Sequence, residues 1–428
     1  MTWGQIGSDI NGESTGDNSG RSVSLSDNGT IVAIGADRNN TETGHVRVYQ
    51  YVDSNWVQLG DDIKGESFYD HSGFSVDISA DGKIVAVGAY ANDRTINSSR
   101  TLQNSGHVRI YQYMNDKWLQ LGNDIDGENS ADYLGRSLSL SDDGTIIAVG
   151  AYGNDNTATN AGKVCIYEYI NNNWLQLGGD IVGINSYDYF GYSTSISSDG
   201  KILAIGALNG DGNGTNSGQV KVYQYTNNNW LQLGDELNGE YAYDYSGYAI
   251  DISSKGNILA VGARRNDDSG ANSGHVRVYQ YINNNWFQLG NDIDGEAEGD
   301  YSGGSISLSD DGTTIAVSSD LNDGKAKDAG HVRIFQYHYI DNVWKQLGDD
   351  IDGEYENDFS GIAVSLEQSA NDIYIAIGAH KNKGSFDRGQ GEAGHVRVFL
   401  NQELNAPTEI TMNMGEEESL GEAGDVSE

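Results

Sequence analysis

The chain has 428 residues and a formal net charge of −38, from 25 Lys and Arg against 63 Asp and Glu. Such a surface repels nucleic acids and anionic membranes, and no apolar run approaches the length of a membrane-spanning helix, so we expect neither nucleic-acid binding nor membrane insertion. The single cysteine, Cys165, excludes an intramolecular disulfide and is interpreted as a packing residue.

Seven copies of one motif run through the chain, each marked by a tryptophan. The tryptophans are Trp3, Trp56, Trp118, Trp174, Trp230, Trp286 and Trp344, and most steps between them are 56 to 62 residues. Each copy reads W-x-Q-L-G-x-D-I-x-G-E, then D-x-S-G-x-S-x-S-x-S-x-D-G, then I-x-A-x-G-A, then G-H-V-R-V-Y-Q-Y. A period above 20 residues indicates a repeat architecture.

The third copy shows how one unit folds. Alternating small polar and apolar residues, a short apolar run and two segments rich in β-branched and aromatic residues predict four strands. These strands are residues 137–141, 146–151, 163–169 and 174–178. Glycine at 144 and the asparagines at 171–173 provide the turns. No segment of the repeat has helical spacing.

Four antiparallel strands per copy, repeated around an axis, predict an all-β, seven-bladed β-propeller. We name the strands A to D from the axis outward. The predicted blades span about 20–60, 73–122, 135–178, 191–234, 247–290, 303–348 and 361–400. The last copy lacks a Trp segment and the chain opens on one, so residues 1–7 are expected to complete the last blade and close the ring. Residues 401–428, acidic and without an aromatic residue, are predicted to be disordered.

Loop lengths distinguish the two faces of the predicted ring. The A–B and C–D turns are short and uniform, whereas the B–C loops vary and are longest at residues 90–105 and 380–393. Variable loops on a rigid repeated scaffold are the usual seat of binding. We therefore expect a ligand site on the face of the B–C loops and D-to-A crossings. The candidate residues are Tyr133, Tyr189, Tyr245, Tyr301, Phe359, Asp93, Arg94 and Arg388.

An aspartate recurs in every D-to-A crossing: Asp17, Asp70, Asp132, Asp188, Asp244, Asp300 and Asp358. Two interpretations are open. Each Asp accepts backbone N–H bonds in a turn, or the seven form an acidic collar that binds Ca²⁺ weakly. Asp211 and Asn213, in an oxygen-rich loop, are further candidate calcium ligands. No other cofactor is indicated.

A histidine opens strand C in five copies: His45, His107, His275, His331 and His395. Lys163 and Gln219 replace it in the other two copies. Because each copy lies on a different blade, the five histidines cannot form one metal triad. We predict a packing or hydrogen-bonding role.

Residues 190–207, F-G-Y-S-T-S-I-S-S-D-G-K-I-L-A-I-G-A, resemble an FG-GAP repeat, and the likeness extends over residues 1–400. That family forms the seven-bladed propeller of integrin α subunits, which implies binding of proteins or glycans at surfaces. Family members often carry a D-x-D-x-D-G calcium loop between strands A and B. Here that turn is too short to surround a cation, so those calcium sites do not transfer. Residues 405–410 resemble the opening of a cadherin-like domain, which implies that the chain belongs to a longer surface protein.

These features predict a non-enzymatic binding or adhesion module for a protein or glycan. No blade carries a unique acid–base pair of the kind that an enzyme needs. Two alternatives remain: a carbohydrate-active propeller, as lectin, lyase or hydrolase, and a structural surface or virion component. We expect a monomeric ring that works extracellularly or on a cell or virion surface, although the chain shows no signal peptide.

Overall fold

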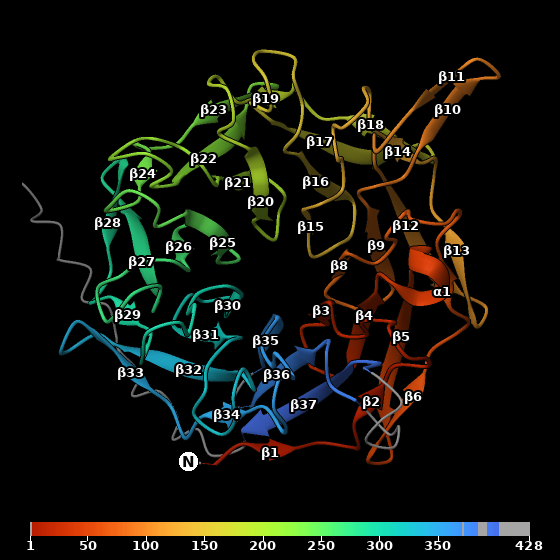
Figure 1. Ribbon diagram of the computed structural model, residues 1–428. Helices are drawn as coiled ribbons and strands as arrows, with labels where there is room; N and C mark the ends of the chain where they lie inside the picture. The colour runs from red at the N-terminus through yellow and green to blue at the C-terminus, as the bar shows by residue number, and fades with distance from the viewer. Residues whose placement is uncertain (1, 370–371, 384–391, 402–428) are drawn as a thin grey trace, which may run out of the picture.

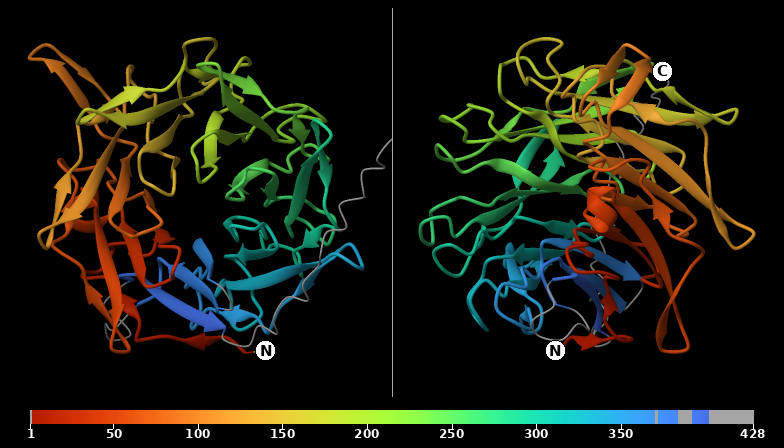
Figure 2. Two further views of the ribbon diagram at one scale, coloured as in Figure 1. Left: turned by 180° about the vertical axis from the view of Figure 1, so that it is seen from behind. Right: turned by 45° about the vertical axis from the view of Figure 1, so that its right-hand side comes forward.

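The computed structural model describes residues 2–369, 372–383 and 392–401, and shows seven antiparallel β-sheets arranged as a ring (Figures 1 and 2). The prediction of an all-β, seven-bladed propeller is confirmed. The one helical segment in the described residues is α1 (Asn39–Glu42), and none of them forms a helix long and apolar enough to cross a membrane. The tail was predicted to start at residue 401, but Asn401 is buried and ends strand β37 (His395–Asn401). The rest of the predicted tail, 402–428, and Arg388 lie outside the described residues.

The first four blades each comprise strands A to D and a short fifth strand. Blade one holds β3 (Ser22–Leu25), β4 (Ile31–Ala36), β5 (His45–Val52), β6 (Asn55–Gln58) and β7 (Ile63–Lys64). Blade two holds β8 (Ser75–Ile78), β9 (Ile84–Ala89), β12 (His107–Met114), β13 (Lys117–Gln120) and β14 (Ile125–Asp126). Blade three holds β15 (Leu138–Leu140), β16 (Ile146–Ala151), β17 (Lys163–Ile170), β18 (Asn173–Gln176) and β19 (Ile181–Val182). Blade four holds β20 (Phe190–Ile196), β21 (Ile202–Ala207), β22 (Gln219–Thr226), β23 (Asn229–Gln232) and β24 (Leu237–Asn238).

The remaining blades follow the same plan. Blade five holds β25 (Ser246–Ile252), β26 (Ile258–Ala263), β27 (His275–Ile282), β28 (Asn285–Gln288) and β29 (Ile293–Asp294). Blade six holds β30 (Ile306–Leu308), β31 (Thr314–Ser319), β32 (His331–His338), β33 (Val343–Gln346) and β34 (Ile351–Asp352). Blade seven holds β35 (Ala363–Ser369), β36 (Asp372–Ala379), β37 (His395–Asn401), β1 (Gly4–Gln5) and β2 (Ile10–Asn11). The B–C loop of blade two adds a projecting hairpin, β10 (Arg94–Asn97) and β11 (Arg100–Leu102).

The fifth strand of each blade is a feature that the repeat pattern did not predict. In blade three, β17 pairs with β18 through Tyr169 and Trp174, and with β19 through Val164 and Ile181. The outer edge of each blade is therefore shared by two segments, because the L-G-x-D part of the motif steps away from strand C and returns. This return brings the motif Asp beside the start of strand C.

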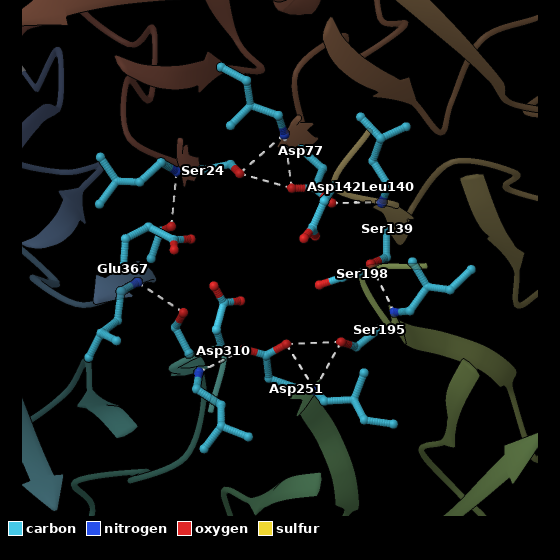
Figure 3. Close-up of a pocket in the computed structure, with 18 of the residues that line it drawn as sticks. Ser24, Asp77, Ser139, Leu140, Asp142, Ser195, Ser198, Asp251, Asp310 and Glu367 are labelled. Carbon is cyan, nitrogen blue, oxygen red and sulfur yellow. Dashed lines mark hydrogen bonds between the residues drawn. The ribbon is translucent and has the colours of Figure 1, made fainter. Parts of the chain in front are cut away.

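Hydrogen bonds accepted by side chains of strand A join every blade to the next around the axis. A serine or aspartate oxygen accepts the backbone N–H of strand A in the following blade, at 2.7 to 3.2 Å (Figure 3). The seven pairs are Ser24 with Ile78, Asp77 with Leu140, Ser139 with Ile196, Ser195 with Ile252, Asp251 with Leu308, Ser307 with Leu366, and Ser365 with Leu25. The alternating serines of the repeat thus serve as contacts between blades.

A second circle of hydrogen bonds runs around the outside of the ring. Each Trp indole Nε1 donates to the carbonyl of the residue before the motif Gly in the preceding copy, as Trp118 does to Leu59 at 2.7 Å. Gly60, with φ of 72°, allows this approach because a Cβ there would lie 3.0 Å from the Trp118 ring. Between the two circles lie apolar clusters such as Ile146, Ala148 and Ile166 of blade three against Leu203 and Ile205 of blade four.

The N-terminal segment closes the ring as expected. Strand β1 pairs with β37 through Gly4 and Leu400, and Trp3 Nε1 donates to the Leu347 carbonyl at 3.2 Å. Closure also extends beyond residue 7, because β2 pairs with β37 through Ile10 and Val396. Both ends of the described chain therefore lie within one sheet.

Deleting residues 2–7 should lower the free energy of unfolding by several kcal/mol, because it removes β1 and the Trp3 indole from blade seven. We expect Trp3→Ala alone to cost on the order of 2–3 kcal/mol, since the indole is half-buried. Trp3→Phe keeps an apolar ring and serves as the control with the smaller loss. Denaturant unfolding of the three variants measures the effect, and equal stability of deletion and wild type would contradict closure by β1.

Candidate functional site

A channel runs along the axis of the ring and has chemically opposite ends. Strand A residues of all seven blades line a cavity of about 250 Å³ at the end formed by the A–B turns. A second cavity of about 240 Å³ lies at the end formed by the B–C loops. Both include Val23, Val76 and Val364 in their walls, so the two cavities are the two ends of one channel.

The turn end of the channel is acidic. Its walls carry Asp27, Asp77, Asp142, Asp251, Asp310 and Glu367, most of them labelled in Figure 3. Burial raises the pKa of Asp77 and of Asp251 to about 6, against opposing hydrogen bonds from backbone N–H groups. Burial and the neighbouring Asp310 charge also raise the pKa of Asp27 to about 6 and that of Glu367 well above its usual value.

These channel acids were not among the residues singled out from the sequence. The available signal was a change within the repeat: Asp77 and Asp251 occupy strand A positions where the other five blades carry serine. Since the carboxylate oxygen accepts the same inter-blade N–H as the serine hydroxyl does, the exchange preserves the ring and adds charge to the channel.

Replacing Asp251 by serine should reduce the loss of folding stability that occurs as the pH rises. A raised carboxyl pKa contributes stability below the unfolded pKa of about 4 that is lost as pH rises through about 6. The stability of Asp251→Ser relative to wild type should therefore increase by on the order of 2 kcal/mol between pH 4 and pH 8. Thermal unfolding across this range measures it. Ser307→Ala, an uncharged change in the channel, should show a difference that does not vary with pH.

The opposite mouth of the channel gathers arginines and aromatic rings. Its walls include Arg21, Phe74, Arg136, Tyr192 and Tyr248, which all occupy the position after the S-G of the repeat or its equivalent. Arg264 and Asp320 reach the same cavity from the B–C loops of blades five and six. We call this set the cationic mouth. It could not be found from single motifs, because its members are about one repeat apart in sequence.

The arginines of the cationic mouth rest on the aromatic rings. The Arg136 guanidinium lies 4.1 Å from the ring centre of Tyr192 and 4.9 Å from that of Phe74, and it donates to the Tyr192 hydroxyl at 2.6 Å. Arg21 lies 4.4 Å from the Phe74 ring centre. Arg264 lies 4.6 Å from the Tyr248 ring centre, and its Nη2 is 3.6 Å from Asp320. Among the described residues that line this mouth, three arginines stand against one aspartate, Asp320.

The two central tyrosines of the mouth respond differently to their surroundings. Burial acts to raise the pKa of Tyr248, but the nearby charges of Arg264 and Arg136 and a hydrogen bond with Tyr192 outweigh it, and the pKa is lowered. Burial raises the pKa of Tyr192, although the Arg136 charge opposes this shift. Within this pair, the arginines favour negative charge at Tyr248.

None of the five predicted crossing aromatics lines the cavity of the cationic mouth, but the four tyrosines among them lie close to its residues. Tyr133 stacks on Tyr152 with ring centres 5.2 Å apart, and Tyr152 in turn contacts Tyr189 at 5.6 Å. Tyr245 and Tyr301 line an adjoining pocket together with Arg264 and Arg265. Phe359 contacts His380 at 5.8 Å. All five crossing aromatics have positive φ, between 52° and 56°, so the backbone holds these side chains in a conformation that most residues avoid.

The candidates from the long B–C loops lie elsewhere. Asp93 accepts the Asn104 backbone N–H at 2.8 Å, and Arg94 Nε lies 3.2 Å from Asp126. Both residues therefore anchor the β10–β11 hairpin at its base. A role for them in ligand binding stays a prediction, as does that of Arg388, which lies outside the described residues.

Six of the seven recurring crossing aspartates are buried, Asp188 is partly exposed, and all seven accept hydrogen bonds. Asp70 accepts the Ser67 backbone N–H at 2.9 Å and the Asn92 amide at 3.1 Å, and Asp132, Asp244, Asp300 and Asp358 each make the equivalent pair of bonds. Asp17 accepts two backbone N–H groups and Asp188 the Asn185 amide. Asp211 accepts the Asn216 N–H, and Asn213 donates to the Gly239 carbonyl. Calcium binding at these residues stays a prediction.

Comparison with known proteins supports the repeat and the fold. The FG-GAP repeat family matches residues 125–167, from the last strand of blade two into blade three, and residues 183–223, from the next crossing into blade four. No curated protein matches the chain significantly. Among solved structures, one described as a putative 6-phosphogluconolactonase from Bacteroides uniformis aligns at 12% identity with a TM-score of 0.55, covering 78% of this chain and 86% of that one. At this identity the likeness concerns the propeller architecture alone.

Proposed function

We propose that the protein is a binding module that takes up an anionic group of a protein or glycan ligand at the cationic mouth. The observation that carries the proposal is the convergence of Arg21, Arg136 and Arg264 on one end of the axis in a chain of net charge −38. Like-charged side chains repel one another, so a cluster of this kind is favoured where a negatively charged partner offsets it.

The chemistry of the mouth suits a carboxylate, sulfate or phosphate carried on a group with an apolar face. Guanidinium groups bind such anions through paired N–H donors. The rings of Tyr248 and Tyr301 beside Arg264 offer flat surfaces for a sugar ring or an aliphatic stem. The cavity of about 240 Å³ is smaller than a pocket for a drug-sized ligand, which is about 300 Å³ or more. It therefore suits one terminal group rather than a long chain.

The role is one of recognition without catalysis. FG-GAP repeats in blades three and four support a propeller that presents a binding surface. The Asp320 carboxylate faces Arg264, and burial lowers the pKa of the nearby His380 to about 3, so this imidazole is an ineffective general base at neutral pH.

Arg136→Gln should weaken binding of an anionic ligand about tenfold or more, because a charge-assisted hydrogen bond contributes about 1.5–3 kcal/mol. The test compares acidic oligosaccharides and acidic peptides with their neutral counterparts by calorimetry. Arg100→Gln, the same charge change on the projecting hairpin, is the control and should leave affinity unchanged. Equal binding of neutral and acidic probes, or equal losses in both variants, would contradict the proposal.

A carbohydrate-active role is the second candidate, and Tyr248 is the observation that favours it. Its lowered pKa beside Arg264 and Arg136 would suit a tyrosinate base that removes a proton next to a uronate carboxylate held by arginine. Such β-elimination would remove the C5 proton and break the bond between C4 and the glycosidic oxygen, which leaves and takes up a proton. The other product is a sugar with a C4–C5 double bond. Incubation with polyuronates distinguishes the candidates: unsaturated product from wild type but not from Tyr248→Phe would establish a lyase and overturn the recognition role.

A further inference from the structure

The histidine that opens strand C lies between two carboxylates in five of the seven blades. In blade six, His331 Nδ1 is 3.9 Å from Glu296 Oε2 and 3.7 Å from Asp350 Oδ2. The Glu belongs to the G-E of the preceding crossing, and the Asp belongs to L-G-x-D. Equivalent groups surround the other four histidines: Glu13, His45 and Asp62; Glu66, His107 and Asp124; Glu240, Asp268, His275 and Asp292; Asp9, Glu354 and His395. The repeat motif thus brings three separated residues together at one point.

These histidines are almost fully buried, and the Nε2 atom of each lacks a hydrogen-bond partner among the described residues. His275 and His395 are each 1% exposed, and neither ring nitrogen makes a hydrogen bond within the described part of the chain. The Nδ1 atoms face carboxylate oxygens at 3.8 to 4.0 Å, which is too long for a hydrogen bond. A buried polar nitrogen without a partner is costly, so this repeated arrangement needs an explanation.

The spacing approaches that of ligands around one metal ion, and small side-chain movements would bring the donor atoms to it. Zinc ligands lie about 2.0–2.2 Å from the ion, so two ligand atoms of one site lie about 3–4 Å apart. The ligand atoms of each of the five groups all lie within 4.8 Å of one another. Blade five offers four such residues, since Asp268 of its B–C loop joins Glu240, His275 and Asp292.

The facing carboxylates are oriented by other side chains, as ligands of metal sites commonly are. In blade six, Gln346 of W-x-Q donates to Asp350 Oδ1 at 2.7 Å, which leaves Oδ2 toward the histidine. Arg333 lies 3.6 Å from Glu296 Oε1, which leaves Oε2 toward the histidine. The Gln of the motif makes the same bond to Asp9, Asp62, Asp124 and Asp292.

Blade three shows that a cation occupies this position. Lys163 replaces the histidine there, and its Nζ lies 2.7 Å from Glu128 Oε2 and 3.0 Å from Asp180 Oδ2. The ammonium therefore sits between the two oxygens that face the imidazole in other blades. Blade four shows the complementary case. Gln219 replaces the histidine, Ile184 replaces the Glu, and Gln219 instead donates to Asn238.

We propose that the five histidine–carboxylate groups are sites for a divalent transition-metal cation, Zn²⁺ or Mn²⁺, bound between neighbouring blades. One imidazole nitrogen and two or three carboxylate oxygens form a mixed donor set that suits these ions better than Ca²⁺, which prefers oxygen ligands alone. Blade five, with the largest donor set, holds the ion most tightly. Blades three and four hold none, because an ammonium or an amide takes the histidine position.

The test counts ions bound by the full chain after chelation and reloading with Zn²⁺, Mn²⁺ or Ca²⁺ in separate experiments. We expect up to five Zn²⁺ or Mn²⁺ per chain, with a rise in Tm. His275→Gln should remove the tightest ion, and it should fold because Gln219 occupies the same position in blade four. His338→Gln, at an exposed histidine outside these groups, is the control and should leave the count unchanged.

A gain-of-site variant makes the proposal independent of any loss of stability. Lys163→His restores the donor set with Glu128, Asp180 and the supporting Gln176, which lies 2.5 Å from Asp180. This variant should bind one more ion than wild type. No retained Zn²⁺ or Mn²⁺ in wild type, or Zn²⁺ and Mn²⁺ binding that is indifferent to His275→Gln, would overturn the proposal, as would an unchanged count in Lys163→His.

Discussion

One hydrogen bond recurs between every pair of neighbouring blades beside the axis, from a backbone N–H of strand A to a side-chain oxygen of the preceding strand A. The bond requires a short side chain with an acceptor, because seven strands crowd the centre. Serine meets the requirement in five blades and aspartate in two, Asp77 and Asp251. A ring built in this way can gain charge in its channel without losing a contact between blades. The acidity of the turn end is therefore compatible with the architecture.

Crowding near the axis also separates the residues that build the ring from those that line the cationic mouth. The glycine of S-G has positive φ in every blade, and a Cβ at Gly73 would lie 2.6 Å from the His45 carbonyl. The backbone is thus fixed at this point, and the following side chain projects into the mouth. Its identity varies, from Arg21 to Phe74 to Tyr192, because the recurring hydrogen bonds between strands A do not involve this side chain. Recognition can therefore change while the scaffold does not.

The blade strands could be predicted because a period of about 56 residues repeats every signal seven times. The two-residue strands such as Ile181–Val182 could not, since two residues show no alternation. The crossing aromatics were predicted as ligand candidates from their recurrence, and the structure places four tyrosines around the mouth. Arg136 and Arg264 were not predicted as site residues, because most other copies carry different residues at the same positions of the repeat. The histidine–carboxylate groups were not predicted either, because their residues are separated along the chain and meet only in the folded ring.

The opposite charges at the two ends of the channel limit what an anionic ligand can do there. An anion attracted to Arg21 and Arg136 meets Asp77, Asp251 and Glu367 if it moves further along the axis. These carboxyl groups are buried, so water screens them weakly and the repulsion is strong. Even where raised pKa values leave some of them protonated, adding a negative charge nearby is unfavourable. Under the proposed function, the anionic group would therefore stop at the arginines, with the rest of the ligand on the loop face, and the channel would act as a receptor open at one end rather than as a conduit.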